Sequence, residues 1–434
     1  MSKAALIKFI QSDRFAYLLI CFLGICSYFT AFGHDFQTLW DDQWVAINSY
    51  TAEGVTYSNL YRIISEFYRG QYAPVNQLYY STLYYIFGYN AFAFHAGSVF
   101  FHIFNAILVY LFIKRLSTVL KLSVDTTHLI SLVTAVLFVV HPVAVESVAW
   151  IAASKVAIYA FFYLAGLLSY LNYLNNKSWL SFVLVIVLFL LSFGAKEQAV
   201  TLPVCLVLID YLYQRDFRNK QVYFEKIPFF VLAIILGYVT MLSQQAYDEG
   251  VLSHKAQYPF YQRIVFANYA VIEYLTKCLI PIKLSYIYPF PIQIGEKLPI
   301  RFWIYPAING VLLLLVYVNF RNRILIFWSS FFLLHLAVAL HIIPIGRFTI
   351  TADRYVYISL IAVCFGLTYL IICLWKFKSR YKYLLLSVYG FILFVYSIQR
   401  VRVWKNSDTL KRDMREILKN REESNSVNNN NQIF

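Results

Sequence analysis

Charged residues are scarce in this chain. Asp, Glu, Lys and Arg together make up 14% of its 434 residues, whereas 60% of the residues are hydrophobic. So little charge excludes an ordinary water-soluble domain, in which about 25% of residues are charged. Windows of about 18 to 22 apolar residues recur along the chain, and each is long enough to cross roughly 30 Å of hydrocarbon as a helix. The sequence therefore predicts an all-α integral membrane protein.

Other absences narrow the class of function. The chain has no HExxH, GxGxxG, CxxC or P-loop motif, which argues against zinc proteases, nucleotide-cofactor enzymes and ATPases. Its six cysteines lie mostly within apolar runs and lack metal-ligand spacing, so we expect neither a disulfide framework nor a metal site. We expect no resident cofactor, with a divalent cation left open. No A-x-A-like cleavage site follows segment 15–33, which is therefore expected to stay as an anchor.

Eleven apolar segments are predicted to span the membrane. They are 15–33, 91–113, 126–141, 154–173, 179–195, 197–213, 226–242, 300–319, 324–343, 355–374 and 381–399. Lys and Arg gather near the N-terminus and in the loops after every second segment, and short basic loops remain cytoplasmic. We therefore attribute the net charge of +15 to basic loops that orient the protein in the bilayer, rather than to nucleic-acid binding. We interpret 264–282 as re-entrant or interfacial, because a span there would move the basic loop 376–382 outside.

The chain divides into one membrane domain, 1–399, and a charged tail, 400–434. The first external loop, 34–90, is expected to contain two interfacial helices. In one, Leu60, Ile63, Ile64 and Phe67 share an apolar face, and the other is QLYYSTLYYIFG, which is too short to span. The segment SNSVNNNNQ near the end of the tail has the composition of a disordered segment.

Five polar motifs fall on or just inside the external face of this topology. They are WDD (40–42), HPVAVES (141–147), ASK (153–155), GAKEQ (194–198) and RFTITADRY (347–355). Ionisable groups at membrane depth are costly and usually face a shared cavity. The five motifs therefore predict one polar site at this face.

Each motif also has a purely structural interpretation. Asp41 and Asp42 could cap a loop helix, and Lys196 with Glu197 could form a local ion pair. His141 could end a helix by bonding to backbone, with Glu146 as its partner. The cations of the site, Lys155, Arg347 and Arg354, could extend toward lipid headgroups.

Carboxylates and cations gathered beneath a membrane surface suit glycosyl transfer from a lipid-linked sugar phosphate. A carboxylate can take the proton of an acceptor hydroxyl as that hydroxyl attacks. Lys and Arg can stabilise the negative charge that develops on the departing phosphate. The lipid tail of such a donor stays in the bilayer, which agrees with the depth of the predicted site.

An ordered set of sequence stretches resembles a known family. The stretches are WDDQWVAIN, FGYNAFAFHAGSVFFH, HPVAVESVAWIAASK, LLSFGAKEQAVTLP, ANYAVIEYLTKCLIPIKLS, IPIGRFTITADRYVYIS and RVRVWKNSDTL. From about 38 to 410 the chain is similar to the multispanning part of the transmembrane and tetratricopeptide-repeat-containing O-mannosyltransferases, within the GT-C superfamily. The resemblance implies a GT-C-type helical bundle and sugar transfer, with inversion, from a polyprenyl-phosphate donor.

The resemblance also implies roles for individual residues. Asp41 or Asp42 would be the catalytic base, and the remaining predicted residues would bind or surround the donor. These donor-site residues are His141, Glu146, Lys155, Lys196, Glu197, Arg347, Asp353 and Arg354. The chain departs from the family pattern at Ala73, Lys155 and Asp353, where the family has Arg, Arg and Glu, and the tetratricopeptide repeats are absent from these 434 residues. Acceptor recognition is therefore expected from the loops or from a separate recruiting protein.

The expected partners are a polyprenyl-phosphate-linked hexose such as mannose, membrane lipids and a hydroxyl acceptor, preferably protein Ser or Thr. Transfer to a glycan or lipid acceptor is the close alternative, and a lipid-sugar flippase is the non-enzymatic one. A transporter would more often show internal repeats, and the sequence has none that we can detect. The expected location is a bacterial inner membrane with a periplasmic site, or the endoplasmic reticulum with a lumenal site in a eukaryote.

Overall fold

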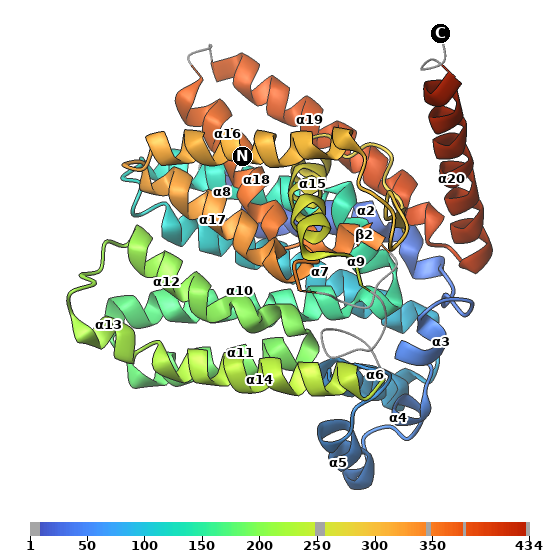
Figure 1. Cartoon of the computed structure of the whole chain (residues 1–434). Coiled ribbons are helices and arrows are strands. Elements are labelled where there is room, and N and C mark those ends of the chain that lie inside the picture. The colour runs from blue at the N-terminus through green and yellow to red at the C-terminus, as the bar shows by residue number, and fades with distance from the viewer. Residues whose placement is uncertain (1–8, 248–256, 344–348, 376–378, 431–434) are drawn as a thin grey trace.

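The computed structural model describes residues 9–247, 257–343, 349–375 and 379–430. In this part of the chain, helices are joined by short loops, and the one sheet is an antiparallel pair of strands, β1 (Tyr288–Pro289) and β2 (Thr349–Thr351). Most long helices run side by side, and β2, α3 and α6 lie toward one end of the bundle (Figure 1).

Within the described residues, six helical stretches are long and apolar enough to cross a membrane. They are α2 with the following turn (Asp13–Gly33), α7 (Ala91–Leu116), α10 with the preceding turn (Ile151–Asn176), α13 with α14 (Lys220–Gln245), α16 with the preceding turn (Ile300–Val318) and α19 (Arg380–Val403). In addition, α8 (Val124–Val139) and the stretch Pro142–Ala149, which contains α9 (Val145–Ala149), form a pair bent by 49°. The protein is therefore an integral, all-α membrane protein.

The remaining predicted spans are shorter helices. They are α11 (Trp179–Ala195), α12 (Leu202–Leu212), α17 with the following turn (Arg323–Ala339) and α18 with the following turn (Ser359–Leu374). Each of the eleven predicted segments thus coincides with a helix, but only six have the full length and composition, so the number eleven remains a prediction. The helices break at His141, Lys196 and Asp353, within the polar motifs. Non-helical backbone at membrane depth is tolerated where it lines a cavity.

The first external loop contains four short helices rather than two. They are α3 (Asp42–Val45), α4 (Ser49–Ala52), α5 (Tyr57–Ser65) and α6 (Pro74–Phe87). The predicted apolar face is shorter than expected, because α5 ends at Ser65 and Phe67 lies beyond it. A turn at Tyr68–Gln71 follows, so the chain reverses where the sequence pattern predicted a continuing helix. The second predicted helix is present as α6.

Two further helices lie across the direction of the bundle (Figure 1). One is α15 (Phe260–Leu279), which covers most of the stretch 264–282 and runs transverse to α10, α11 and α14. This orientation fits the expectation of a helix at an interface. The other is α20 (Ser407–Asn430), in the tail. Reciprocal bonds between Asn406 and Thr409 start α20, and the helix continues through much of the segment expected to be disordered.

The basic loops meet at the end of the bundle opposite the polar motifs. There, the Lys114 ammonium lies 2.5 Å from Asp13, and Arg115 donates to Asn172 at 2.8 Å. Lys226 pairs with the buried Asp210 at 2.7 Å. The two ends therefore carry different chemistry: basic loops at one end and the predicted site at the other.

Candidate functional site

A cavity of about 640 Å³ brings together residues from four of the five motifs. Its lining includes five of the ten predicted site residues, namely Asp41, Lys155, Lys196, Glu197 and Arg354. Asp41 precedes α3, Lys155 begins α10, and Arg354 follows β2. Residues that are more than 300 positions apart in the sequence, such as Asp41 and Arg354, therefore share one cavity. Five of the predicted site residues thus surround one cavity, and their roles remain predictions.

The two neighbouring aspartates differ in position. Asp41 lines the cavity, and the indole Nε1 of Trp44 donates to its Oδ1 at 3.2 Å. Asp42 is only 1% exposed and accepts two backbone N–H bonds of 2.7 Å, from Gln37 and Ala152. Asp42 therefore joins the first external loop to the loop before α10. The geometry favours Asp41 as the group that meets a ligand.

Burial has a measurable consequence for Asp42. It raises the pKa of this carboxyl group from 3.8 to about 7, although the two backbone N–H bonds oppose the shift. With this raised pKa, the Asp42 carboxyl group can remain protonated and uncharged near pH 7. Asp42 holds two backbone N–H groups whereas Asp41 lines the cavity, and which of the two is the base remains a prediction.

Arg354 is held by Glu146, a partner 208 residues earlier in the chain. Its guanidinium forms an ion pair with Glu146 Oε1, and its backbone N–H donates to Glu146 Oε2 at 3.0 Å. Glu146 is 4% exposed and does not line the cavity. The guanidinium also lies over the rings of Trp150 (5.5 Å) and Tyr355 (5.0 Å). Glu146 therefore orients Arg354 rather than facing the cavity, and it is not the partner of His141.

Asp353 points away from the cavity, although it is adjacent to Arg354. Its Oδ1 accepts a hydrogen bond from the Tyr288 hydroxyl at 2.9 Å and lies 3.7 Å from the Lys277 ammonium. Burial raises the pKa of Asp353 to about 6, while Lys277 acts in the opposite direction. Asp353 does not line the cavity, and its predicted contact with the donor remains a prediction. It instead attaches the segment after β2 to α15 and β1.

Lys155 and Lys196 both line the cavity but differ in their surroundings. Lys155 Nζ donates to Gln71 Oε1 at 2.8 Å. Lys196 is 1% exposed, with its Nζ 3.4 Å from Glu197 Oε1. The expected local ion pair with Glu197 is therefore present, and both of its members line the cavity.

His141 is a further predicted residue that does not line the cavity. His141 is buried; its Nε2 lies 3.0 Å from the Cys278 carbonyl oxygen, and its Nδ1 accepts from Val143 N–H at 3.3 Å. This is the structural alternative of a helix-end residue bonded to backbone. Arg347 lies outside the described residues.

Sequence reasoning missed the aromatic part of the lining. Trp40, Trp44, Trp150 and Tyr286 line the cavity, and the ring of Tyr286 lies 4.9 Å from Trp40 and 5.2 Å from Trp150. Trp40 belongs to the WDD motif and Trp44 and Trp150 lie near polar motifs, but Tyr286 lies outside all five, and the abundance of aromatic residues in the chain gives no signal that selects these four. Arg69 also lines the cavity, although it was not among the predicted site residues. Aromatic faces beside cations and carboxylates are suited to a polar ligand that also has apolar surfaces, such as a sugar.

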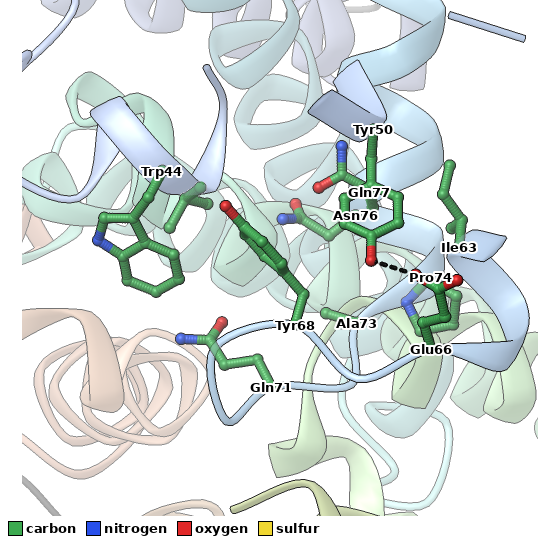
Figure 2. Close-up of a pocket in the computed structure, with 11 residues that line it drawn as sticks. Trp44, Tyr50, Ile63, Glu66, Tyr68, Gln71, Ala73, Pro74, Asn76 and Gln77 are labelled. Carbon is green, nitrogen blue, oxygen red and sulfur yellow. Dashed lines mark hydrogen bonds between the residues drawn. The ribbon is translucent and has the colours of Figure 1, made fainter. Parts of the chain in front are cut away.

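A smaller pocket of about 50 Å³ adjoins the cavity and shares Trp44, Val45, Gln71 and Ala73 with it. Figure 2 shows Trp44 and Tyr68 on one side of this pocket and Asn76 and Gln77 beside Tyr50. The Tyr50 hydroxyl donates to Glu66 at 2.6 Å. Trp44 lines both the pocket and the large cavity, and its indole N–H is the one that donates to Asp41.

Within the described ranges, no group of three His, Cys, Asp or Glu side chains is arranged to hold a metal ion. The ionisable groups that line the cavity include one carboxylate at Asp41, an ion pair at Lys196 and Glu197, and further cations against aromatic rings. Comparison of the chain with protein-family models and with curated proteins gives no match. The family resemblance accordingly remains a proposal based on the motifs.

Proposed function

We propose that this protein is a membrane glycosyltransferase that moves a sugar from a polyprenyl-phosphate donor to a hydroxyl acceptor. The observation that carries the proposal is the shared cavity of Asp41, Lys196 and Arg354, at one end of a bundle of apolar helices. In this proposal Asp41 takes the acceptor proton, and the cations stabilise the phosphate as the glycosidic bond breaks. The aromatic walls would cover the apolar faces of the sugar.

The proposed reaction forms one bond, breaks one bond and transfers one proton to a residue of the cavity. The acceptor oxygen forms a bond to the anomeric carbon and loses its proton to Asp41. The bond from that carbon to the phosphate oxygen breaks, and the polyprenyl phosphate leaves with the electron pair. Attack from the face opposite the leaving group gives inversion. The Trp44 N–H bond to Asp41 fixes the orientation of the carboxylate.

The test is sugar transfer by purified protein in lipid nanodiscs, with a short-chain polyprenyl-phosphate mannose as donor. Asp41→Asn is expected to lower turnover by roughly 10² to 10⁴-fold, because a general base contributes about that much. Asp35→Asn removes an exposed carboxylate of the same loop and is the matched control. Unchanged turnover in Asp41→Asn would remove this residue from the mechanism.

The same assay separates the possible acceptors. A Ser- and Thr-containing peptide and a short glycan are offered with the same donor. Transfer to the peptide supports protein O-glycosylation, and transfer to the glycan alone supports cell-envelope polysaccharide modification. Movement of the lipid-linked sugar across sealed vesicles without transfer would instead support a flippase.

A further inference from the structure

The turn at Tyr68–Gln71 has an unusual residue at its tip. Tyr68 and Gln71 exchange backbone hydrogen bonds of 3.1 and 3.0 Å, and the two residues between them have positive φ, 48° at Arg69 and 71° at Gly70. This is the conformation of a two-residue hairpin turn that favours Asn-Gly. A long side chain rarely adopts the left-handed conformation at the first central position. An Arg residue at this position is therefore unfavourable for the conformation of the turn.

The turn is fixed between two helices of the bundle. Lys155, at the start of α10, donates to the Gln71 side chain at 2.8 Å. Ser243, near the end of α14, lies 3.4 Å from the Gly70 carbonyl oxygen. Arg69 thus stands on a backbone that is held at the edge of the cavity rather than on a free loop.

Side chains of this turn reach two spaces. Tyr68 lines the small pocket and not the large cavity (Figure 2), whereas Arg69 lines the large cavity and not the pocket. The Arg69 guanidinium lies 5.5 Å from the Trp44 ring centroid and 5.9 Å from that of Tyr68. The turn therefore forms a partition that presents one cation to the cavity.

The cavity cations differ in how their charge is compensated. Arg354 pairs with Glu146, and Lys196 pairs with Glu197. Among the residues that the structure describes, no carboxylate forms an ion pair with Arg69, which is exposed and lies against aromatic faces. The planar guanidinium thus keeps a charge and a fork of N–H donors that match a phosphate oxygen pair.

We propose that Arg69 is a further ligand of the donor phosphate, and this inference rests on the proposed function above. The ligand class is an isoprenyl phosphate, whose anionic head would meet Arg69 on the side of the cavity that holds the Tyr68–Gln71 turn. The strained position is then explained by binding, because backbone strain at a functional site is offset by the ligand contact.

The decisive variant is Arg69→Asn, because Asn suits the left-handed backbone and removes the charge. Binding of farnesyl phosphate to the full chain in detergent is compared with binding of farnesol, its uncharged counterpart. We expect Arg69→Asn to weaken farnesyl phosphate binding by roughly 10- to 100-fold, as for the loss of one charged hydrogen-bonding group. Farnesol binding and the melting temperature should not fall.

Lys177→Asn is the matched control. Lys177 also has a left-handed backbone (φ 52°) and a cation 5.0 Å from an aromatic ring, that of Tyr173, but it ends α10 far from the cavity lining. Its replacement should leave farnesyl phosphate binding unchanged. Arg69→Gly, which also suits the turn, serves as a second variant if Arg69→Asn is poorly folded.

The outcomes separate this inference from the proposed function. Wild-type affinity in folded Arg69→Asn and Arg69→Gly would overturn the inference and assign Arg69 to the turn alone, while leaving the function to the Asp41 test. An equal loss of farnesyl phosphate and farnesol binding would also overturn it. A wild-type protein that binds no farnesyl phosphate and loses no turnover in Asp41→Asn would contradict both proposals.

Discussion

At the scale of single residues, adjacent ionisable side chains in this protein make different contacts. Asp41 faces the cavity while Asp42 holds two backbone N–H groups, and Arg354 faces the cavity while Asp353 bonds Tyr288 and lies near Lys277. Neighbouring residues outside regular helix periodicity can point in opposite directions, so a motif alone does not say which member meets a ligand. In both pairs the buried aspartate positions the segment and its neighbour lines the cavity.

Asp42→Asn is expected to destabilise the protein by about 1–3 kcal/mol, because an amide offers one acceptor oxygen and places an NH₂ group against a second backbone N–H. The pH dependence should change as well. The folded-state pKa of about 7 exceeds the ordinary 3.8, so the unfolded chain releases the proton first, and this group lowers stability as pH rises from about 4 to 7. Melting in detergent as a function of pH measures both effects. A wild-type slope that persists in Asp42→Asn would contradict this assignment.

Arg354 variants are expected to be graded in activity. Arg354→Lys keeps a positive charge but loses the fork that can contact Glu146 and a phosphate at once, so transfer should fall. Arg354→Gln should be worse, because it also leaves the buried Glu146 without a charged partner. Transfer and donor hydrolysis to water are measured together. Loss of both supports a donor role, whereas loss of transfer alone would place Arg354 on the acceptor side.

At the scale of elements, breaks in helices build the cavity. The bend after α8 and the break after α11 each end a helix at a polar motif, and β2 with the turn at Asp353 precedes α18. The sequence predicted that these motifs would meet, since alternating spans bring them to one face. It did not predict that Glu146 pairs with Arg354, because that pairing depends on helix rotation and on contacts across 208 residues. The early end of α5 was also missed, because Gly70 is a weak signal within an amphipathic pattern.

The cluster that joins α15 to the two strands should behave as one unit. Lys277 lies 3.7 Å from Asp353 and 3.4 Å from the Thr351 hydroxyl oxygen, and the Ala352 backbone N–H of the same segment donates to the Tyr274 hydroxyl at 3.0 Å. Lys277→Met is expected to destabilise the protein by about 3–5 kcal/mol, because it leaves a buried carboxylate without its cation. When Asp353→Asn is added to Lys277→Met, the double variant should recover part of the lost stability. Melting of the two single variants and the double variant forms the test, and strictly additive losses would show that the pair is not coupled.

At the scale of the whole molecule, composition was sufficient to predict a membrane protein but not to predict how many helices span the membrane. Apolar windows predicted every helix of the bundle, because a membrane requires backbone groups to bond within one segment. The windows could not show that α12 has only 11 residues, since the apolar run continues through the turn that follows Lys196. The helix α20 was not predicted, because the tail is rich in charged and polar residues; the prediction of disorder covered only its end, SNSVNNNNQ.

The orientation of the bundle gives a further prediction. Gln43, near the cavity, and Asn219, at the basic end, are both exposed. Single cysteines are placed at these positions after the six native cysteines are replaced. Because basic loops remain cytoplasmic, an impermeant maleimide should label Gln43→Cys on intact cells and Asn219→Cys only after permeabilisation. The reverse pattern would place the cavity in the cytoplasm and remove the argument for an external acceptor.

Whether the transverse helix α15 spans the membrane determines the orientation of the helices that follow it. Its first turns lie beside the loop that follows β1, because Gln262 donates to the Glu296 carbonyl oxygen at 2.8 Å. A helix at the interface leaves both flanks on one side of the membrane, whereas a span would separate them. Cysteines at the exposed positions Gln257 and Lys297 should therefore both be labelled from the side that labels Gln43→Cys. Labelling of only one of the two on intact cells would make α15 a span and reverse the orientation of every helix after it, including the segment that carries Arg354.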